Sequence, residues 1–260
     1  EVLRRGDTDF HDLYPDGTLS LTLNGVLATS SNIGTILAAE RIGGKKLSKY
    51  LKKFGIGQPT GLKFPGESNG FVPEHEDWSP TSFPTISFGQ GLSVNSVQVA
   101  SVYSTIANDG LRVEPSLVKR IIHADGTSEQ PAAPQTTRVV SRDTAIQMRV
   151  MLESVVGKGG TATKAKIPGY RVGGKTGTAQ VNDVRIGGYS DEVIASFVGM
   201  APADNPRLVV GVFISEPQIG RYGGELAAPV FKKVSSYALG ALQIPPTGSK
   251  APKLALTFGG

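Results

Sequence analysis

The chain has 260 residues, of which 39% are hydrophobic and 19% charged, with a net charge of +5 and no cysteine. This is enough chain to bury a full core, and the composition is that of a globular protein. The lack of cysteine excludes disulfides and cysteine-ligated metals, and no apolar run reaches the ~18 residues of a membrane span. The modest positive charge permits an anionic partner, but no basic and aromatic interleaving suggests nucleic acid.

The first forty residues predict a polar opening followed by two helices. Residues 1–18 are turn-rich, and Tyr14-Pro-Asp-Gly17 is typical of a β-turn. Helices are expected over Leu19–Leu27 and Ile33–Ile42, separated by a polar corner that contains Ser30, Ser31 and Asn32. Since nothing at the start looks like a signal peptide, we expect the chain to open within a domain.

A third helix and a long loop follow. Leu47, Tyr50, Leu51 and Phe54 recur at helical spacing, while five lysines fall mostly elsewhere around the helix and are interpreted as a solvated face. Residues 55–84 are rich in glycine and proline and predict an irregular loop. Such a loop is either functional or a surface excursion held by aromatic side chains, here Phe71, Trp78 and Phe83.

The middle of the chain carries local start and turn signals. Asn95 is a candidate N-cap of a helix that runs to Ile106. The pair Asp125-Gly126 predicts a hairpin turn, and Ser141 is expected to begin a helix that Lys158-Gly-Gly160 ends.

The last third predicts a sheet and one helix. Strands are expected over 172–181, 193–200 and 207–216, with connections short enough to make them antiparallel. The run from Leu208 to Ile214 is apolar on both faces, as in a central strand. Pro229 is expected to open a final helix that reaches Ala241. Residues 244–260 are expected to form a disordered tail.

The strand around Lys175 carries the richest chemistry. It places one lysine and two threonine hydroxyls within four residues, next to glycines that allow close approach to the backbone. Strand alternation sends Lys175 and Gly177 to one face and Thr176 and Thr178 to the other. A cation, hydroxyls and a bare backbone N–H suit a carboxylate, although a lone lysine on a solvated strand would give the same pattern.

A second motif favours the functional interpretation. Ser30-Ser31-Asn32 alone could be an ordinary helix cap, but Ser-x-Asn followed downstream by Lys175-Thr-Gly-Thr178 gives two of the three signature elements of penicillin-binding proteins and serine β-lactamases. The likeness continues, in order, through Phe10-His-Asp12, Phe54–Gly61, Phe64–Glu67, Gly89–Val94, Ile106–Gly110, Gly160–Ala162 and Ala201–Pro206. From about Phe10 to about Leu242 the chain resembles the transpeptidase domain of class B penicillin-binding proteins, most of all the division-specific (septal) enzyme of actinobacteria.

The resemblance implies an α+β penicillin-binding/serine β-lactamase-like fold, in which helices cover an antiparallel sheet beside an all-helical subdomain. Residues 1–243 would be the C-terminal part of the transpeptidase domain. Within it, 19–110 would be the mainly helical part with the Ser-x-Asn corner, and 111–243 would hold a hairpin, a helix, the sheet and the final helix. The fold would be incomplete at its N-terminus.

The fold would be incomplete because the family's nucleophile is missing from this chain. In the family it is the serine of a Ser-x-x-Lys motif located upstream of Ser-x-Asn. No such motif precedes Ser30. A literal match occurs only at Ser116-Leu-Val-Lys119, after Pro115 and in a β-branched segment where residues i and i+3 would face opposite sides of a strand. We therefore expect the nucleophile to lie upstream of residue 1. We also expect residues 1–260 alone to be catalytically inactive and poorly stable as a fold.

The family's reaction is acyl transfer: the serine attacks a D-Ala-D-Ala stem peptide, and the acyl group passes to an amine of a neighbouring stem, which cross-links peptidoglycan. By resemblance, Ser30, Asn32 and Lys175 are catalytic. Ser30 would relay a proton to the leaving nitrogen, Asn32 would hold the substrate amide, and Lys175 would lower the pKa of the absent lysine.

The same resemblance makes Thr176, Gly177 and Thr178 the substrate-binding residues. The threonines would bind the terminal carboxylate of the stem peptide or of a β-lactam, and the N–H of Thr178 would supply one oxyanion-hole donor. Ser31 stands where many β-lactamases have aspartate. No cofactor or metal is expected, because His11, His75 and His123 lack ligand spacing.

The implied partners are stem peptides of the lipid-linked precursor or nascent glycan, β-lactam antibiotics and membrane proteins of the divisome. The implied location is the extracytoplasmic face of the cell membrane, through a single-pass anchor upstream of residue 1. Two alternatives stay open. One is a non-catalytic scaffold that keeps the fold and its carboxylate site; the other is a serine β-lactamase, although the Glu-x-x-x-Asn element of class A is missing.

Overall fold

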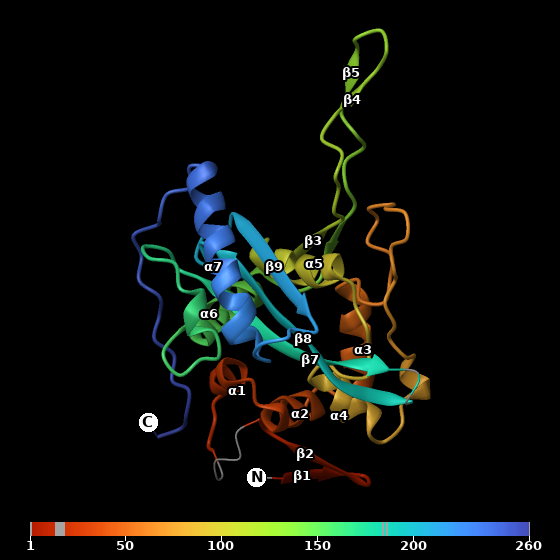
Figure 1. Cartoon of the computed structure of the whole chain (residues 1–260), viewed down its shortest axis with the longest axis vertical. Helices are drawn as coiled ribbons and strands as arrows, with labels where there is room; N and C mark the ends of the chain where they lie inside the picture. Colours follow the sequence, from red (N-terminus) through yellow and green to blue (C-terminus); the bar gives the residue numbers. More distant parts are fainter. Residues whose placement is uncertain (1, 14–18, 184, 186, 260) are drawn as a thin grey trace.

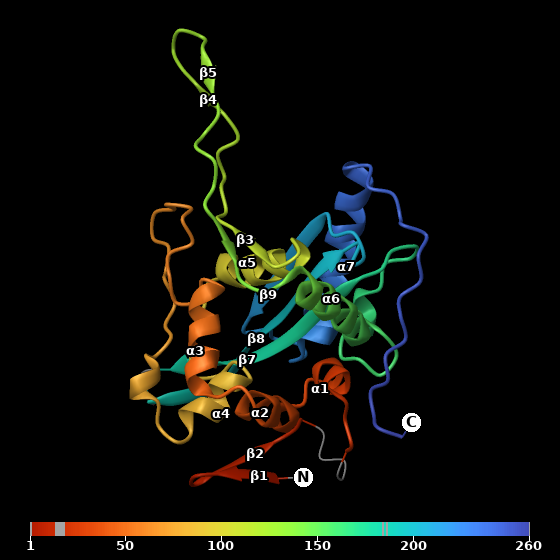
Figure 2. The ribbon, with the colours of Figure 1, turned by 180° about the vertical axis from the view of Figure 1, so that it is seen from behind.

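A three-stranded antiparallel sheet forms the centre of the computed structural model, which describes residues 2–13, 19–183, 185 and 187–259. Its strands are β7 (Gly173–Asp183), β8 (Gly188–Ala201) and β9 (Leu208–Ser215), in the order β7-β8-β9. Helix α7 (Gly223–Ala241) covers one face, and α5 (Ser96–Ala107) and α6 (Arg142–Val156) lie on the other (Figures 1 and 2). The predicted antiparallel sheet between helices is confirmed.

One strand prediction is wrong. The run from Leu208 to Ile214 was expected to be central, but among the described strands β9 lies at the sheet edge and β8 in the centre. The apolar pattern of β9 arises because α7 and α5 pack on its two faces. A strand covered on both faces is apolar on both, wherever it lies in the sheet.

The core lies between the sheet and α7. Phe197 of β8 and Phe231 of α7 are fully buried and pack edge to face, with ring centroids 4.8 Å apart. Helix α7 begins at Gly223, earlier than the predicted start at Pro229, which lies inside it. The start is set by packing, because a Cβ at Gly223 would lie 2.0 Å from the carbonyl oxygen of Ser196.

The helical region lies beside the sheet and follows the N-terminal β1–β2 hairpin (Figure 1). The first helix starts later than predicted, because Leu21 forms a β-bridge with Thr257 and Thr22 caps the helix by accepting a hydrogen bond from the backbone N–H of Gly25. The elements are β1 (Val2–Arg5), β2 (Thr8–His11), α1 (Leu23–Thr29), α2 (Asn32–Glu40), α3 (Gly44–Lys53) and α4 (Ser82–Ser87).

The predicted caps of α5 and α6 are confirmed. The side chain of Asn95 accepts a hydrogen bond from the N–H of Gln98 at 2.8 Å, and the N–H of Asn95 donates to Gln98 Oε1 at 2.9 Å, which completes a capping box. Ser141 caps α6 by accepting from the N–H of Thr144 at 3.1 Å.

The predicted loop over 55–84 contains a 3-10 turn (His75–Asp77) and the start of α4. Trp78 stacks on Phe83 with ring centroids 6.2 Å apart, and its indole N–H donates to the carbonyl of Pro73. Phe71, expected as a third anchor, is 61% exposed and does not serve as one.

A long two-stranded arm projects at the top of Figure 1. Its base is β3 (Leu111–Val113) paired with β6 (Thr136–Arg138), and its tip is β4 (Ile121–Ile122) paired with β5 (Ser128–Glu129). The predicted Asp125-Gly126 turn is confirmed, with Gly126 at φ 85°. Ser116, however, precedes β4 and is not in a strand; its hydroxyl bonds to the backbone of Val118.

The C-terminal segment differs from the expectation of a disordered tail. Its described residues, 244–259, form neither a helix nor a named strand. The side chains of Thr247 and Ser249 nevertheless both donate to Asp204, and the carbonyl of Leu256 accepts from the N–H of Thr22. Composition could not reveal these long-range contacts. The β-turn predicted at 14–17 lies outside the described residues, and within the described ranges no helix combines the length and hydropathy needed to cross a membrane.

Candidate active site

The Ser-x-Asn corner is the turn between α1 and α2. Ser30 ends α1 in the left-handed conformation, φ 60° and ψ 44°, and its N–H donates to the carbonyl of Val26. Ser31 is the N-cap of α2, where its Oγ accepts from the N–H of Gly34 at 2.9 Å. The sharp reversal at Ser30 leaves its hydroxyl projecting from the corner toward the sheet.

Strand β7 brings Lys175 to this hydroxyl. Lys175 Nζ donates to Ser30 Oγ at 2.7 Å and to the carbonyl of Thr176 at 3.2 Å. The residue is only partly exposed, and burial lowers the pKa of its ammonium to about 8. At neutral pH Lys175 is therefore mostly a cation that donates to Ser30, and a modest rise in pH releases its proton.

The two threonines of β7 lie beside a second loop and the start of α7. Thr176 Oγ1 and Thr161 Oγ1 are 2.8 Å apart, and Thr178 Oγ1 accepts from the N–H of Gly223 at 3.4 Å. Gly223 is the first residue of α7, so the positive end of that helix faces these hydroxyls. Hydroxyls, a nearby ammonium and a helix N-terminus together suit an anionic group such as a carboxylate.

Gly177 must be small for this arrangement to exist. It pairs with Ser196 of β8, and a Cβ at Gly177 would lie 2.5 Å from Ser196 Oγ. The structure thus places Lys175, Thr176, Gly177 and Thr178 together on strand β7.

Asn32 lies at the start of α2, one residue beyond Ser31. Its side-chain Nδ2 donates to the carbonyl of His11 at 3.1 Å, so part of its amide is already committed to β2. It shares the corner with Ser30, which Lys175 contacts, while its own side chain bonds to the backbone of His11.

Sequence reasoning assigned no role to two residues of this site, although both lie in segments that carry the family resemblance. Asp12 accepts from Ser31 Oγ at 2.7 Å and from the N–H of Ile33 at 3.0 Å. It thereby places a carboxylate next to Ser31, the middle residue of the Ser-x-Asn motif. Thr161 was noticed only within Gly160–Ala162, without a role. Both residues contact partners that are distant in the sequence. The only signal for them in the sequence was that each lies in a segment that resembles the family.

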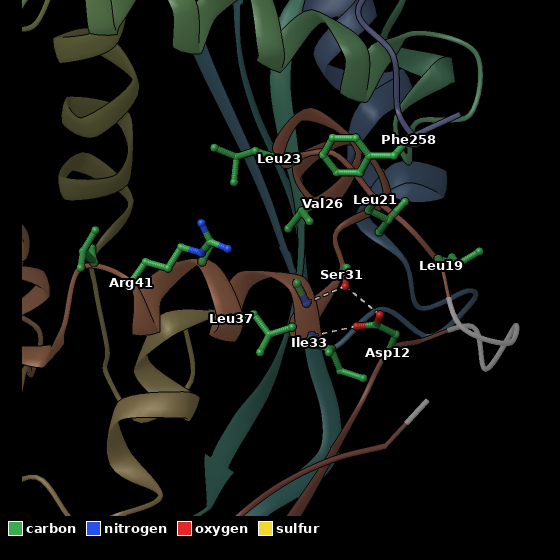
Figure 3. Close-up of a pocket in the computed structure, with 13 residues that line it drawn as sticks. Asp12, Leu19, Leu21, Leu23, Val26, Ser31, Ile33, Leu37, Arg41 and Phe258 are labelled. Carbon is green, nitrogen blue, oxygen red and sulfur yellow. Dashed lines mark hydrogen bonds between the residues drawn. The ribbon is translucent and has the colours of Figure 1, made fainter. Parts of the chain in front are cut away.

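An apolar groove of about 560 Å³ lies behind the corner, between α1 and α2 (Figure 3). Asp12 and Ser31 form part of its wall, and Arg41 lies along α2 at one side. Its apolar lining is contributed by Leu19, Leu21, Leu23, Val26, Ile33, Leu37, Ile42 and Phe258. Several of these side chains are exposed, Leu23 by 62% and Phe258 by 72%, so the groove is an uncovered apolar surface.

The described part of the chain contains no group of three or more histidine, aspartate or glutamate side chains arranged to hold a metal ion. His75 packs against the ring of Trp78, and His123 lies 3.8 Å from Glu129 on the arm. The polar groups at the site include the hydroxyls of Ser30, Thr176 and Thr178 and the ammonium of Lys175.

Comparison with known proteins agrees with this geometry. Residues 4–236 match the family described as the penicillin-binding protein transpeptidase domain. The chain is 39% identical to penicillin-binding protein PbpB of Mycolicibacterium smegmatis and 38% identical to PbpB of Mycobacterium tuberculosis. The matches cover 98% of this chain in both cases, and 41% and 39% of those proteins.

Solved structures give the same result. The crystal structure of penicillin-binding protein 3 from Mycobacterium tuberculosis, complexed with ampicillin, superposes with a TM-score of 0.92 at 37% identity over 98% of this chain and 59% of that one. A peptidoglycan synthetase from Bifidobacterium adolescentis gives a TM-score of 0.89 at 30% identity, over 99% of this chain and 46% of that one.

The fold and the match over most of the chain define the class of domain as a penicillin-binding protein transpeptidase domain. The chain belongs to the penicillin-binding protein transpeptidase family, of the class B type represented by mycobacterial PbpB. It spans about two fifths of the length of these curated relatives.

Proposed function

We propose that this chain is part of a peptidoglycan D,D-transpeptidase that cross-links stem peptides through a serine acyl-enzyme and is inhibited by β-lactams. The observation that carries the proposal is the hydrogen bond from Lys175 Nζ to Ser30 Oγ beside the two threonine hydroxyls of β7. It joins a proton relay to an anion-binding strand, as acyl transfer from a carboxylate-terminated peptide requires.

In this reaction a serine oxygen attacks the carbonyl carbon of the penultimate D-Ala, and its proton goes to a neutral lysine beside it. The tetrahedral intermediate collapses, the C–N bond breaks, and the leaving nitrogen of the last D-Ala takes a proton. Ser30 passes that proton, because its hydroxyl can donate to the leaving nitrogen while Lys175 donates to its oxygen. The amine of a neighbouring stem then attacks the ester carbonyl and releases the serine.

Strand β7 binds the anionic groups of the reaction. Thr176 and Thr178 hold the terminal carboxylate, aided by Lys175 and the start of α7. The N–H of Thr178 donates to the developing oxyanion, a contribution typically worth about 3 kcal/mol of transition-state stabilisation. Asn32 holds the substrate amide. A β-lactam carries its own carboxylate to the same place and leaves a stable acyl ester.

We propose that the nucleophile is the serine of the family's Ser-x-x-Lys motif; no such motif precedes Ser30 in this chain. We further propose a septal role, divisome membrane partners and an extracytoplasmic location through an upstream anchor. Ampicillin and aztreonam complexes of the related Mycobacterium tuberculosis protein support β-lactam binding.

The proposal is tested by turnover in the complete protein that contains this chain. A D-Ala-D-Ala stem peptide thioester should be consumed, and an analogue with a terminal carboxamide should be a poor substrate. Thr178→Val should reduce the preference for the carboxylate, whereas Thr137→Val, on the exposed strand β6, should leave it unchanged. Folded protein that consumes neither substrate would reject the proposal.

A further inference from the structure

The β1–β2 hairpin contacts both ends of α2, the helix that starts at the Ser-x-Asn corner. We call residues 2–12 the brace. At the start of α2, Asp12 and His11 bind the first residues of the helix. At its last residue, Glu40, the guanidinium of Arg5 donates from Nε to Oε1 at 2.5 Å and from Nη2 to Oε2 at 2.9 Å. The hairpin therefore fixes the position of the whole helix.

Asp12 makes the contacts that lie closest to the site. One carboxylate oxygen accepts from Ser31 Oγ at 2.7 Å and the other from the N–H of Ile33 at 3.0 Å (Figure 3). The second bond satisfies one of the unpaired amides of the first helical turn and places a negative charge at the positive end of α2. Ser31 is only 5% exposed, so its bond to Asp12 is shielded from competing water.

Ser30 depends on such contacts for its conformation. A left-handed backbone is unfavourable for a residue with a Cβ and persists only where the surroundings determine it. The N–H groups of Ser30 and Ser31 both donate to the carbonyl of Val26, which ties the corner to α1. Asp12 ties the same corner to the brace, and these two attachments together set the direction of Ser30 Oγ.

The brace is itself anchored. Its strands pair along their full length, from Val2 with His11 to Arg5 with Thr8. Phe10, two residues before Asp12, is buried and packs edge to face against Phe88 with ring centroids 6.0 Å apart. The carboxylate of Asp12 is therefore fixed by the hairpin, and its position does not depend on that of α2.

We propose that Asp12 is a positioning residue of the active site, which acts through Ser31 and the start of α2 to hold Ser30 against Lys175. It does not touch the reacting atoms. The brace is thus the part of the fold that fixes the distance between the helical corner and strand β7. This inference rests on the proposed function, because it assigns Asp12 a part in the same reaction.

The test uses the complete protein with Asp12→Ala, Asp12→Asn and the control Asp9→Ala. Asp9 lies on the same hairpin, is exposed, and makes an ion pair with Arg4 at 3.9 Å. The first readout is the rate of acylation by a fluorescent penicillin. The second is the titration of Lys175, followed by competitive acetylation at a series of pH values and mass spectrometry of its peptide. The second readout does not require activity.

Asp12→Ala should slow acylation by about 10- to 100-fold, since small displacements of a catalytic group have effects of that order. It should also move the Lys175 midpoint up from about 8 toward 10.5, because a loosened corner admits water around the ammonium. Asp12→Asn should have smaller effects, since its amide oxygen can still accept from the N–H of Ile33. Asp9→Ala should match the wild type.

If Asp12→Ala lowered the melting temperature but left both the acylation rate and the Lys175 midpoint unchanged, Asp12 would be only a helix cap and the inference would be overturned. Wild-type protein that is never acylated would reject the proposed function instead. In that case the Lys175 titration would still decide whether Asp12 positions the corner.

Discussion

Lys175 Nζ donates a hydrogen bond to Ser30 Oγ at 2.7 Å, although the two residues are 145 positions apart in the sequence. Lys175 comes from the sheet and Ser30 from the helical region, so this bond joins the two parts of the fold. The site exists only where the Ser-x-Asn corner packs against β7. Changes to either side therefore have consequences that can be measured.

Replacing Lys175 with alanine should slow acylation of the complete protein by a β-lactam by about 10²- to 10³-fold, the usual loss when one preorganised donor is removed. The side chain supplies the hydrogen bond to Ser30 and a positive charge beside the anion-binding threonines. The rate is measured with a fluorescent penicillin under pseudo-first-order conditions. Lys164→Ala, which removes an exposed lysine in the 3-10 turn at Thr163–Ala165, is the matched control. Equal rates for both variants would contradict the role of Lys175.

Lys175 should also make stability depend on pH. Burial lowers the pKa of its ammonium in the folded protein to about 8, below the 10.5 of a free lysine. Between these values the unfolded chain keeps a proton that the folded chain has released, so the free energy of unfolding rises with pH across this window. Below pH 8 both states are protonated and the burial penalty is fully present.

The matched comparison is Lys175→Met, which keeps the length of the side chain and removes the charge. Urea unfolding of both proteins from about pH 7 to about pH 11 gives the difference in free energy of unfolding, wild type minus variant. That difference should be flat below about 8 and then rise toward 10.5. A difference that stays constant throughout would show that Lys175 titrates like an exposed lysine.

The bond between Thr161 and Thr176 predicts an effect on ligand binding. Thr161→Val keeps the shape of the side chain but removes the hydroxyl that lies 2.8 Å from Thr176 Oγ1, which frees Thr176 to rotate. The concentration of β-lactam needed for half-maximal acylation rate should rise about 10-fold, the effect of one lost hydrogen bond of ~1.4 kcal/mol. Thr163→Val, at an exposed residue two positions away, should change nothing. A loss confined to the maximal rate would contradict this interpretation.

The core between β8 and α7 predicts a large stability change. Phe197→Ala removes a fully buried ring from an edge-to-face pair with Phe231, and should lower the free energy of unfolding by about 3–5 kcal/mol. Urea unfolding monitored by circular dichroism measures it. Ile219→Ala, at a side chain that is 86% exposed, should stay within about 0.5 kcal/mol of the wild type. A small effect at Phe197 would mean that the core relaxes around the cavity.

Local chemistry explains what the sequence predicted well. The caps at Asn95 and Ser141 and the turn at Asp125-Gly126 each depend on residues within a few positions, so their signals are visible in the chain itself. The Ser30 and Lys175 motifs were equally visible, because each is a short run of unusual chemistry. Their resemblance to a known family, not spacing, predicted that they would meet.

The differences come from tertiary contacts. Helix α7 starts at Gly223 because a glycine there can approach the backbone of β8. The sequence rules for helix starts do not include such a tertiary contact. The edge position of β9 was hidden by helices on both of its faces. Asp12 reaches Ser31 from 19 residues away, and nothing between them marks the contact.

The most direct test of the account is the intact mass of the complete protein after exposure to a β-lactam, followed by peptide mapping, with Lys175→Ala as the comparison. We predict one stable acyl adduct, on a serine N-terminal to residue 1, that forms much more slowly in the variant. The absence of an adduct on well-folded protein, or an adduct on Ser116, would contradict the assignment of this site to serine acyl transfer.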